Sequence, residues 1–309
     1  MNNSGIPVPT NDRLDVSAER RLGPLGTVGP LALGCWRLVG SDTTNSRIVN
    51  AAVDLGMTLI DNADVYGLDW GGTHFGACEE SLGRVLAGAP SLRNQVVVAT
   101  KGGIIPGVPY ESGGAYLQEA VRASLRRLGV DHIDLYQIHR PDHFTHPAEI
   151  AAAFSRLHQD GLVRAFGVSN YGAAQTRALL AHVDVPLVST QPEISALRLD
   201  ALRDGTLDHC TETGMVPLAW SPLAGGRLAT GDGVPPALLA VLDDIAGRES
   251  VSRSAVAVAF VLAHPSDPVA IVGTQNVDRL ADIAAATRVH LARTDVYRIV
   301  EASDGRPLP

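Results

Sequence analysis

The chain has 309 residues, of which 45% are hydrophobic and 19% charged, a composition that is ordinary for a globular protein. Its formal net charge of −8 and isoelectric point near 5.6 argue against nucleic acid or an anionic membrane surface as the main partner. Cys35, Cys78 and Cys210 lie far apart without a CxxC pair, so we expect reduced thiols in a cytoplasmic protein.

The N-terminal residues 1–18 are polar and rich in Asn, Pro and Ser. They lack the apolar core of a secretory signal and predict a flexible leader. The longest apolar stretch, residues 255–263, is far shorter than a membrane span and predicts a buried helix. We therefore expect residues 19–309 to form one folded domain without a membrane-spanning segment.

From residue 31 onward, short apolar runs rich in β-branched residues alternate with segments of helical periodicity. The runs predict eight strands, at residues 31–36, 58–63, 96–102, 133–139, 165–170, 187–193, 216–222 and 269–274. The intervening segments, which include residues 116–129, 147–161 and 173–183, predict helices, several of which stop at a glycine. Eight uninterrupted β–α units favour an α/β protein with a single (β/α)8 TIM barrel and a helix at the C-terminus. No GxGxxG follows any predicted strand, so a Rossmann phosphate-binding turn is not expected.

In such a barrel the chemistry lies at the C-terminal ends of the strands. The second predicted strand ends at Asp61, and Tyr66 follows in the next loop. Lys101 ends the third strand and His139 the fourth. These four residues therefore meet at one rim of the barrel and form the predicted catalytic group.

The four residue types together suit proton transfer. A free tyrosine has a pKa near ~10, and a neighbouring lysine cation lowers that value by stabilising the phenolate. A carboxylate beside the lysine keeps it charged, which is the role we assign to Asp61. His139 can orient a carbonyl by hydrogen bonding or pass a proton on.

Each residue also has a structural interpretation. Asp61 and Lys101 could form an ion pair at the rim, His139 could be a core histidine, and Tyr66 could pack on the barrel lip. The catalytic interpretation is favoured because all four fall at adjacent strand ends.

His143 and His146 follow His139 and, with Asp142, raise the hypothesis of a zinc site. We expect no metal, because His139 already has a role and the segment is typical of an irregular loop.

Seven motifs resemble those of the aldo-keto reductase superfamily, in the family's order and spacing, over about residues 20–300. They are LIDNADVYG (59–67), VVVATKGG (96–103), LYQIHRPD (135–142), GVSN (167–170), QPEIS (191–195), LAWSPLAGGRL (218–228) and IVGTQNVDRL (271–280). The chain is most similar to bacterial members that carry Trp in the AWS segment. The resemblance implies reduction of an aldehyde or ketone to an alcohol with NADPH, or the reverse oxidation with NADP+. It makes Tyr66 the general acid/base, tuned by Lys101 and Asp61, with His139 orienting the carbonyl.

The resemblance also implies a set of cofactor contacts. Ser169, Asn170 and Gln191 would bind the nicotinamide carboxamide, and Trp220 would stack on the nicotinamide ring. The remaining contacts are Ser221, Leu223, Gly225 and Arg227 at the pyrophosphate, and Gly273, Thr274, Gln275 and Arg279 at the adenosine end. Cys35, Trp36 and Asp61 are further expected cofactor contacts.

Two features depart from the family pattern. Many members carry Lys-Ser where this chain has Gly273 and Thr274, so recognition of the 2′-phosphate rests on Arg279 and Arg227. The loop at residues 67–80 is longer than expected.

The long loop contains Trp70 and Phe75, and we predict that both contact the substrate together with Trp36. Arg140 is the one obvious anchor for an anionic group at the barrel mouth. Aromatic or medium-sized aldehydes are therefore the expected substrates.

Two other functions stay open at this point. The barrel could bind NADP(H) as a sensor or scaffold with little turnover, or Lys101 could form a Schiff base in a lyase. The expected partner is a small carbonyl or alcohol, not nucleic acid or a membrane, and the chain is expected to be a monomer or a weak homo-oligomer.

Overall fold

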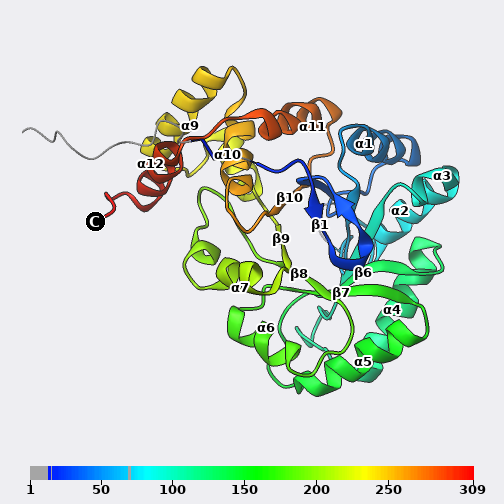
Figure 1. Cartoon of the computed structure of the whole chain (residues 1–309). Helices are drawn as coiled ribbons and strands as arrows, with labels where there is room; N and C mark the ends of the chain where they lie inside the picture. The colour runs from blue at the N-terminus through cyan, green and yellow to red at the C-terminus, as the bar shows by residue number, and fades with distance from the viewer. Residues whose placement is uncertain (1–12, 15, 69–70) are drawn as a thin grey trace, which may run out of the picture.

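The computed structural model describes residues 13–14, 16–68 and 71–309. Within them, eight parallel strands close into a barrel in the order β10-β3-β4-β5-β6-β7-β8-β9 (Figure 1). The strands are β3 (Leu31–Gly34), β4 (Leu59–Asp61), β5 (Val97–Gly102), β6 (Ile133–Ile138), β7 (Val163–Ser169), β8 (Leu187–Gln191), β9 (Val216–Ala219) and β10 (Val269–Val272). All eight predicted strands and the predicted TIM barrel are confirmed. Several predicted strands run past the observed C-terminal ends, because the chain leaves the sheet where the polar rim residues begin.

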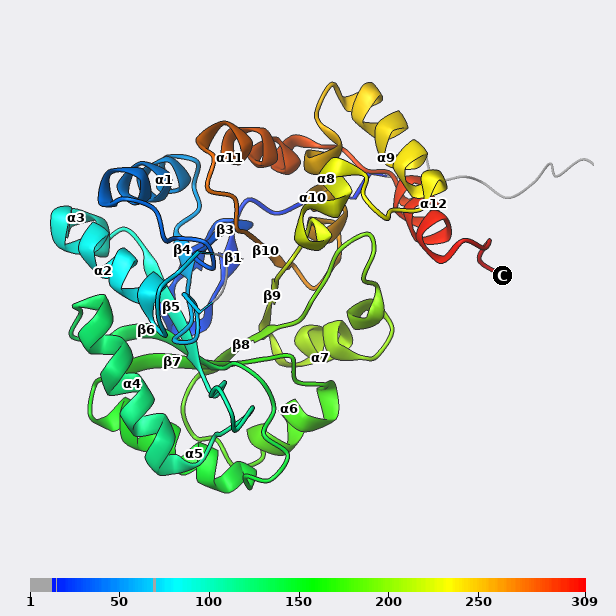
Figure 2. The same cartoon turned by 180° about the vertical axis from the view of Figure 1, so that it is seen from behind.

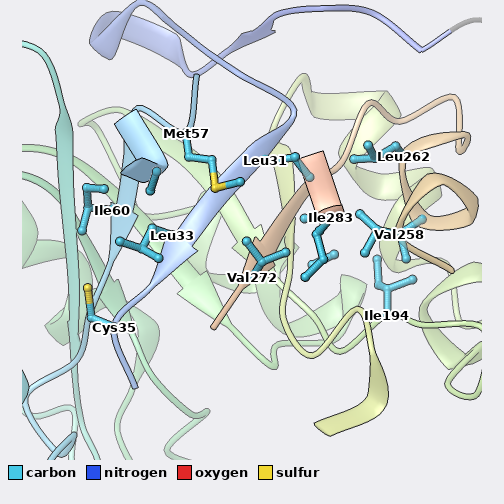
Figure 3. Packing of buried hydrophobic residues seen from close by; sticks show 14 of the residues in the cluster. Leu31, Leu33, Cys35, Met57, Ile60, Ile194, Val258, Leu262, Val272 and Ile283 are labelled. Atoms are coloured by element: carbon cyan, nitrogen blue, oxygen red, sulfur yellow. The ribbon is translucent and has the colours of Figure 1, made fainter. Parts of the chain in front are cut away.

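The strands have two buried faces. Leu31 and Leu33 of β3 belong to the layer between barrel and helices, whereas Ala32 between them belongs to the barrel interior. This alternation follows from the two-residue period of a strand. Figure 3 shows part of the outer layer, where Leu31 and Leu33 lie among residues that include Val272 of β10 and Ile283 of α11.

Helices surround the barrel, as both views show (Figures 1 and 2). The α-helices are α1 (Asp42–Asp54), α2 (Ala77–Gly88), α3 (Pro90–Arg93), α4 (Gly114–Leu128), α5 (Pro147–Gln159), α6 (Ala173–Leu180), α7 (Thr206–Thr213), α8 (Arg227–Thr230), α9 (Pro236–Glu249), α10 (Arg253–Leu262), α11 (Val277–Ala284) and α12 (Arg293–Asp304). The 3-10 turns are η1 (Gly23–Leu25), η2 (Asp200–Leu202), η3 (Ala224–Gly226) and η4 (Ala285–Arg288).

Local sequence explains the predicted helices. In α4, Leu117, Val121 and Leu128 recur at helical spacing on the buried face, and Gly129 ends the helix with a φ of 62°. The apolar stretch 255–263 forms most of α10, which is buried from residue 255 to residue 262. No helix among the described residues is both long and apolar enough to cross a membrane.

A short antiparallel hairpin that the sequence did not predict closes the N-terminal end of the barrel. It pairs β1 (Arg20–Arg21) with β2 (Thr27–Val28) around η1. Leu22 and Val28 are buried in the interior cluster with barrel residues such as Leu59, so the hairpin seals the end opposite the strand C-termini. Strands of two residues are too short to show an alternating pattern.

The start of the described chain lies against the segment just before α12. Leu14 donates its backbone N–H to Leu291 O, and Arg13 forms a β-bridge with Ala292. The predicted leader, residues 1–18, falls largely outside the described residues. The predicted C-terminal helix is α12, which is tied to α9 by Arg248 Nη2–Asp295 Oδ2 at 2.8 Å.

Candidate active site

The four predicted catalytic residues come together at the C-terminal end of the barrel. Asp61 is the last residue of β4, Lys101 lies near the end of β5, and His139 directly follows β6. Asp61, Ala99 and Lys101 share the interior face of their strands, because side chains two apart point the same way. The loop after β4 returns Tyr66 over this face, where its ring lies beside Lys101 and His139.

Asp61 and Lys101 form a buried ion pair. Lys101 Nζ lies 2.7 Å from Asp61 Oδ2 and also donates to Asn62 O at 2.8 Å. Burial acts to lower the pKa of Lys101, but the negative charges of Asp61 and of the Tyr66 phenolate outweigh it and raise that pKa. The predicted ion pair is therefore present, and it keeps the lysine charged.

Tyr66 keeps its proton more firmly than the sequence argument predicted. Lys101 Nζ lies 5.1 Å from the ring centroid and acts to lower the pKa of the phenol, as expected. Burial is the larger effect, and with the charge of Asp61 it raises the pKa of Tyr66 above 10.0. The expectation of a lowered pKa was wrong, because it counted the lysine and left out the loss of water.

His139 is a neutral imidazole in this setting. Burial, followed by the positive charges of Lys101 and Arg140, lowers the pKa of His139 well below its usual 6.5. Its ring meets that of Tyr66 edge to face, with centroids 5.7 Å apart. Nδ1 is buried and has no hydrogen-bond partner among the described residues. A neutral ring can offer one N–H to a carbonyl oxygen.

The residues predicted to bind the nicotinamide end are connected by hydrogen bonds. Asn170, with a φ of 59°, donates through Nδ2 to His139 O at 3.2 Å and to Ser169 Oγ at 2.8 Å. Trp220 donates through Nε1 to Asn170 Oδ1 at 3.1 Å, so the amide that bonds the His139 backbone also holds the indole. Gln191 donates through Nε2 to Asp61 Oδ1 at 2.9 Å, so its amide touches the catalytic group directly.

The predicted pyrophosphate segment has the backbone of an anion-binding loop. Ser221 and Ala224 have φ values of 52° and 51°, and Gly225 and Gly226 have φ values of 71° and 101°. Such left-handed turns direct successive N–H groups toward one side. Leu223 immediately precedes η3, and Arg227 is exposed and donates through Nε to Ala224 O at 3.4 Å.

The predicted adenosine segment offers unsatisfied donors. Gln275 Nε2 is buried and has no hydrogen-bond partner in the described part of the chain. Arg279, at the start of α11, is exposed and forms no ion pair with any described residue. Gly273 is exposed and Thr274 is half-buried beside it. These orphan donors fit a dinucleotide with an added phosphate group.

The predicted substrate residues have separate locations. Trp36 is 37% exposed at the mouth, with the Arg37 guanidinium 5.5 Å from its ring, and Cys35 before it is fully buried. The Arg127 guanidinium carbon lies 5.7 Å from the centroid of the Phe75 ring. Trp70 lies outside the described residues.

Phe75 therefore already has a protein partner in Arg127. Burial first, then the charges of Cys78 and Asp61, raises the pKa of Cys35, which makes its thiol unreactive.

The geometry does not favour the lyase interpretation of Lys101 and gives other roles to the residues of the zinc hypothesis. A lyase needs an uncharged lysine, whereas the pKa of Lys101 is raised and its Nζ is held by Asp61. His146 caps α5 by accepting from Ala148 N at 3.1 Å, and Asp142 accepts from Ser112 N, Phe144 N and Thr145 Oγ1. The described residues hold no group of three acidic, histidine or cysteine side chains placed to bind a metal.

The sequence argument missed a residue that touches the catalytic group. Gln137 of β6 donates through Nε2 to Asp61 Oδ1 at 3.4 Å, from inside the barrel. The signal was available, because Gln137 stands two residues before His139 and therefore shares its face of the strand.

A surface hollow of about 410 Å³ lies away from this site, between α2 and α4. Its arginines are already engaged, since Arg84 pairs with Asp42 at 2.8 Å and Arg127 with Glu79 at 2.7 Å. We attach no function to it.

Comparison with known proteins agrees with the geometry. The sequence profile of the Aldo/keto reductase family matches residues 30–304. The chain is 43% identical to a 6-dehydroglucose reductase of Novosphingobium aromaticivorans, over 99% of this chain and 100% of the relative. It is 33% identical to a 6-dehydroglucose reductase of Agrobacterium fabrum, over 89% and 94%.

A solved structure shares the architecture. The aldo-keto reductase of Klebsiella pneumoniae in complex with NADPH superposes with a TM-score of 0.79 at 25% identity, covering 95% of this chain and 96% of that one. The chain therefore belongs to the aldo/keto reductase family.

Proposed function

We propose that this NADP(H)-dependent aldo/keto reductase reduces a sugar aldehyde, 6-dehydroglucose, to glucose. Two relatives from different organisms carry that activity in their names, and one of them aligns over its full length at 43% identity. The observation in this chain that best supports a polar substrate is the Arg140 guanidinium beside His139, which lies against the Trp220 ring and pairs with no carboxylate of the described residues.

Tyr66 is the proposed general acid. The bound dinucleotide supplies the hydride, and the alkoxide that results needs a proton. Burial raises the pKa of Tyr66, so the phenol carries that proton throughout the neutral range. As the proton leaves, the Lys101 cation 5.1 Å from the ring centroid stabilises the phenolate, and Asp61 keeps the lysine charged.

His139 is proposed to position the aldehyde. Its pKa is lowered well below 6.5, so it donates a hydrogen bond as a neutral ring and carries no charge that competes with Tyr66 for the oxygen. Asn170 bonds both the His139 backbone and the Trp220 indole. We propose that this linkage sets the distance between the carbonyl and the ring that stacks on Trp220.

Arg140 is proposed to bind the sugar hydroxyls. Its guanidinium lies 5.8 Å from the Trp220 ring centroid, and its charge acts on His139, the preceding residue. A planar guanidinium can donate to two neighbouring hydroxyl oxygens at once. Trp36 is proposed to supply the apolar wall opposite, while substrate contacts from Trp70 and Phe75 stay predictions.

The phosphate groups of the cofactor are proposed to bind the exposed cations. Arg227 and the left-handed turns at Ser221 and Gly225 would take the pyrophosphate, and Arg279 the 2′-phosphate. Gln275 Nε2, which has no described partner, would bond the adenosine end.

The substrate assignment is tested by comparing two aldehydes of the same carbon number. We would measure kcat/KM with NADPH for 6-dehydroglucose and for hexanal, in the wild type and in Arg140→Met. The expected wild-type preference for the sugar is at least about tenfold, since one good charged hydrogen bond contributes about 1.5 kcal/mol or more. In Arg140→Met the preference should fall by a similar factor. A wild type that favours hexanal, or a preference that survives in Arg140→Met, contradicts the proposal.

We further propose that the chain acts in the cytoplasm as a monomer or a weak homo-oligomer. The three cysteines are buried free thiols, which fits a reducing compartment. Size-exclusion chromatography with light scattering would test the assembly state.

A further inference from the structure

A polar layer crosses the barrel interior just below the catalytic rim. In the strand register Lys101 is paired with Gln137, Gln137 with Gly167, and Gly167 with Ser189. The next interior layer toward the N-terminal end is apolar, and its members on β5, β6 and β7 are Ala99, Leu135 and Ala165. The interior therefore changes from apolar to polar within one two-residue step.

Gln137 and Lys101 hydrogen-bond different oxygens of the Asp61 carboxylate. Asp61 Oδ2 accepts from Lys101 Nζ at 2.7 Å. Asp61 Oδ1, on the other side, accepts from Gln137 Nε2 at 3.4 Å and from Gln191 Nε2 at 2.9 Å. Both amides hold Oδ1, which leaves Oδ2 directed at the lysine.

Ser189 and Gly167 determine the orientation of the Gln137 amide. Ser189 Oγ donates to Gln137 Oε1 at 3.4 Å, and a flipped amide would direct its carbonyl oxygen at the Asp61 carboxylate. A Cβ on Gly167 would lie 2.2 Å from Ser189 Oγ and 3.0 Å from Gln137 Cγ. Only glycine leaves room for this arrangement.

We propose that Gln137 is a positioning residue of the reductase: oriented by Ser189, its amide holds Asp61 so that the carboxylate serves Lys101. Among the described residues, the Gln137 side chain hydrogen-bonds Asp61 and Ser189 and forms no hydrogen bond with Tyr66 or His139. It acts through Asp61, and its effect on proton transfer passes through the charge of Lys101.

The effect has a definite sign. The charge of Asp61 raises the pKa of Lys101 most strongly while Oδ2 is held 2.7 Å from Nζ, and a carboxylate that lacks the Gln137 donor is held there less firmly. Without the Gln137 amide the pKa of Lys101 should fall. The other titratable groups that face the pair are Cys35 just after β3, Tyr66 from the loop after β4, and His139, itself beside Arg140.

The sequence makes a direct test possible, because Lys101 is the only lysine of the chain. Protein labelled with carbon-13 at lysine Cε gives one lysine resonance, which reports the ionisation of Lys101 without cofactor or substrate. Gln137→Met removes the amide at nearly constant volume. Thr190→Val is the matched control, since Thr190 is buried on β8 and its hydroxyl has no described partner.

In Gln137→Met the lysine resonance should titrate about half a pH unit or more below the wild type, the equivalent of a net hydrogen bond. In Thr190→Val it should titrate as in the wild type. In a background of Asp61→Asn, adding Gln137→Met should produce no further shift, because the group through which Gln137 acts is already neutral.

The pH dependence of kcat provides a second measurement beside the NMR titration of Lys101. The alkaline limb of kcat against pH, measured with any aldehyde the enzyme turns over, should move down with the Lys101 titration in Gln137→Met. A lower kcat with an unmoved lysine resonance, or equal shifts with and without Asp61, would overturn the proposal and leave Gln137 a packing residue. If Gln137→Met does not fold, Ser189→Ala decides instead: a smaller shift of the same sign supports the proposal, and none contradicts it.

Discussion

At the scale of single residues, the site is governed by which groups lose water. Tyr66, Lys101 and His139 are all removed from solvent, yet their pKa values move in different directions. The phenol and the ammonium group keep their protons, and the imidazole loses its own. At the C-terminal rim of the barrel, Tyr66 is therefore a protonated acid, Lys101 a fixed cation and His139 a neutral hydrogen-bond donor. This combination suits protonation of an alkoxide near neutral pH.

Replacing Tyr66 by Phe tests the proposed role of Tyr66 as the general acid. The ring and its packing against His139 remain, but the proton donor is lost, so kcat for aldehyde reduction should fall about a thousandfold. NADPH binding, followed by quenching of tryptophan fluorescence, should stay near the wild-type value. A barrel that only sensed NADP(H) would give the same low turnover before and after the substitution.

Asp64 is a second buried carboxyl group, outside the catalytic group. Burial, and then the charge of Glu79, raises the pKa of Asp64 to about 8 from a usual 3.8, while Arg127 opposes the shift. Its Oδ1 has no described hydrogen-bond partner. Because the folded state binds this proton more tightly than the unfolded chain, Asp64 contributes less stability as pH rises from about 4 to 8.

Asp64→Asn should remove that pH dependence. Relative to the wild type, the variant should gain unfolding free energy between pH 4 and pH 8, by about 5 kcal/mol at most, because most of the pKa difference falls between these two pH values. Urea denaturation at both pH values measures the change. Parallel stability curves for the two proteins would show that Asp64 titrates normally.

At the scale of elements, the hairpin β1–β2 closes one end of the barrel, and the loops at the opposite end carry the candidate site. The hairpin places Leu22 inside the closed end of the barrel, where its side chain is fully buried. The site residues occupy the other end. Stability and catalysis should therefore respond to different substitutions.

Leu22→Ala should destabilise the fold by about 2–5 kcal/mol, the usual cost of a cavity left by a buried leucine. The kcat and KM values for an aldehyde should stay close to those of the wild type at a temperature where both proteins are folded. A large change in KM for NADPH would show that the hairpin is coupled to the site.

The proposed cofactor site combines the turn before α8 with the start of α11. Arg227→Ala and Arg279→Ala should each weaken NADPH binding about tenfold or more, by loss of a charge-assisted contact. In Arg279→Ala, NADH binding should change little, since NADH lacks the 2′-phosphate. Arg288→Ala removes another exposed arginine, from η4, and serves as the control for net charge. Equal losses for both cofactors in Arg279→Ala would reassign that residue.

At the scale of the whole molecule, the barrel and its rim followed from the sequence because both depend on local signals. Eight apolar runs with helical segments between them predict the closed sheet, and the residue ending each run predicts the rim. The hairpin β1–β2 escaped prediction, because two-residue strands have no period.

Effects that depend on three-dimensional surroundings were also missed. The net pKa shift of Tyr66 depends on how much water the loop after β4 excludes, which no motif states. Gln137 carried a usable signal in its spacing from His139, but its contact with Asp61 joins β6 to β4 and appears only in the closed barrel.

The most direct measurement follows the hydride itself. Purified protein would be given 6-dehydroglucose and NADPH carrying deuterium at the transferred position, and the product examined by NMR. The account predicts glucose with deuterium at C6, formed by the wild type and not by Tyr66→Phe. Unlabelled glucose, or no reduction of this aldehyde while other aldehydes are reduced with label transfer, would contradict it.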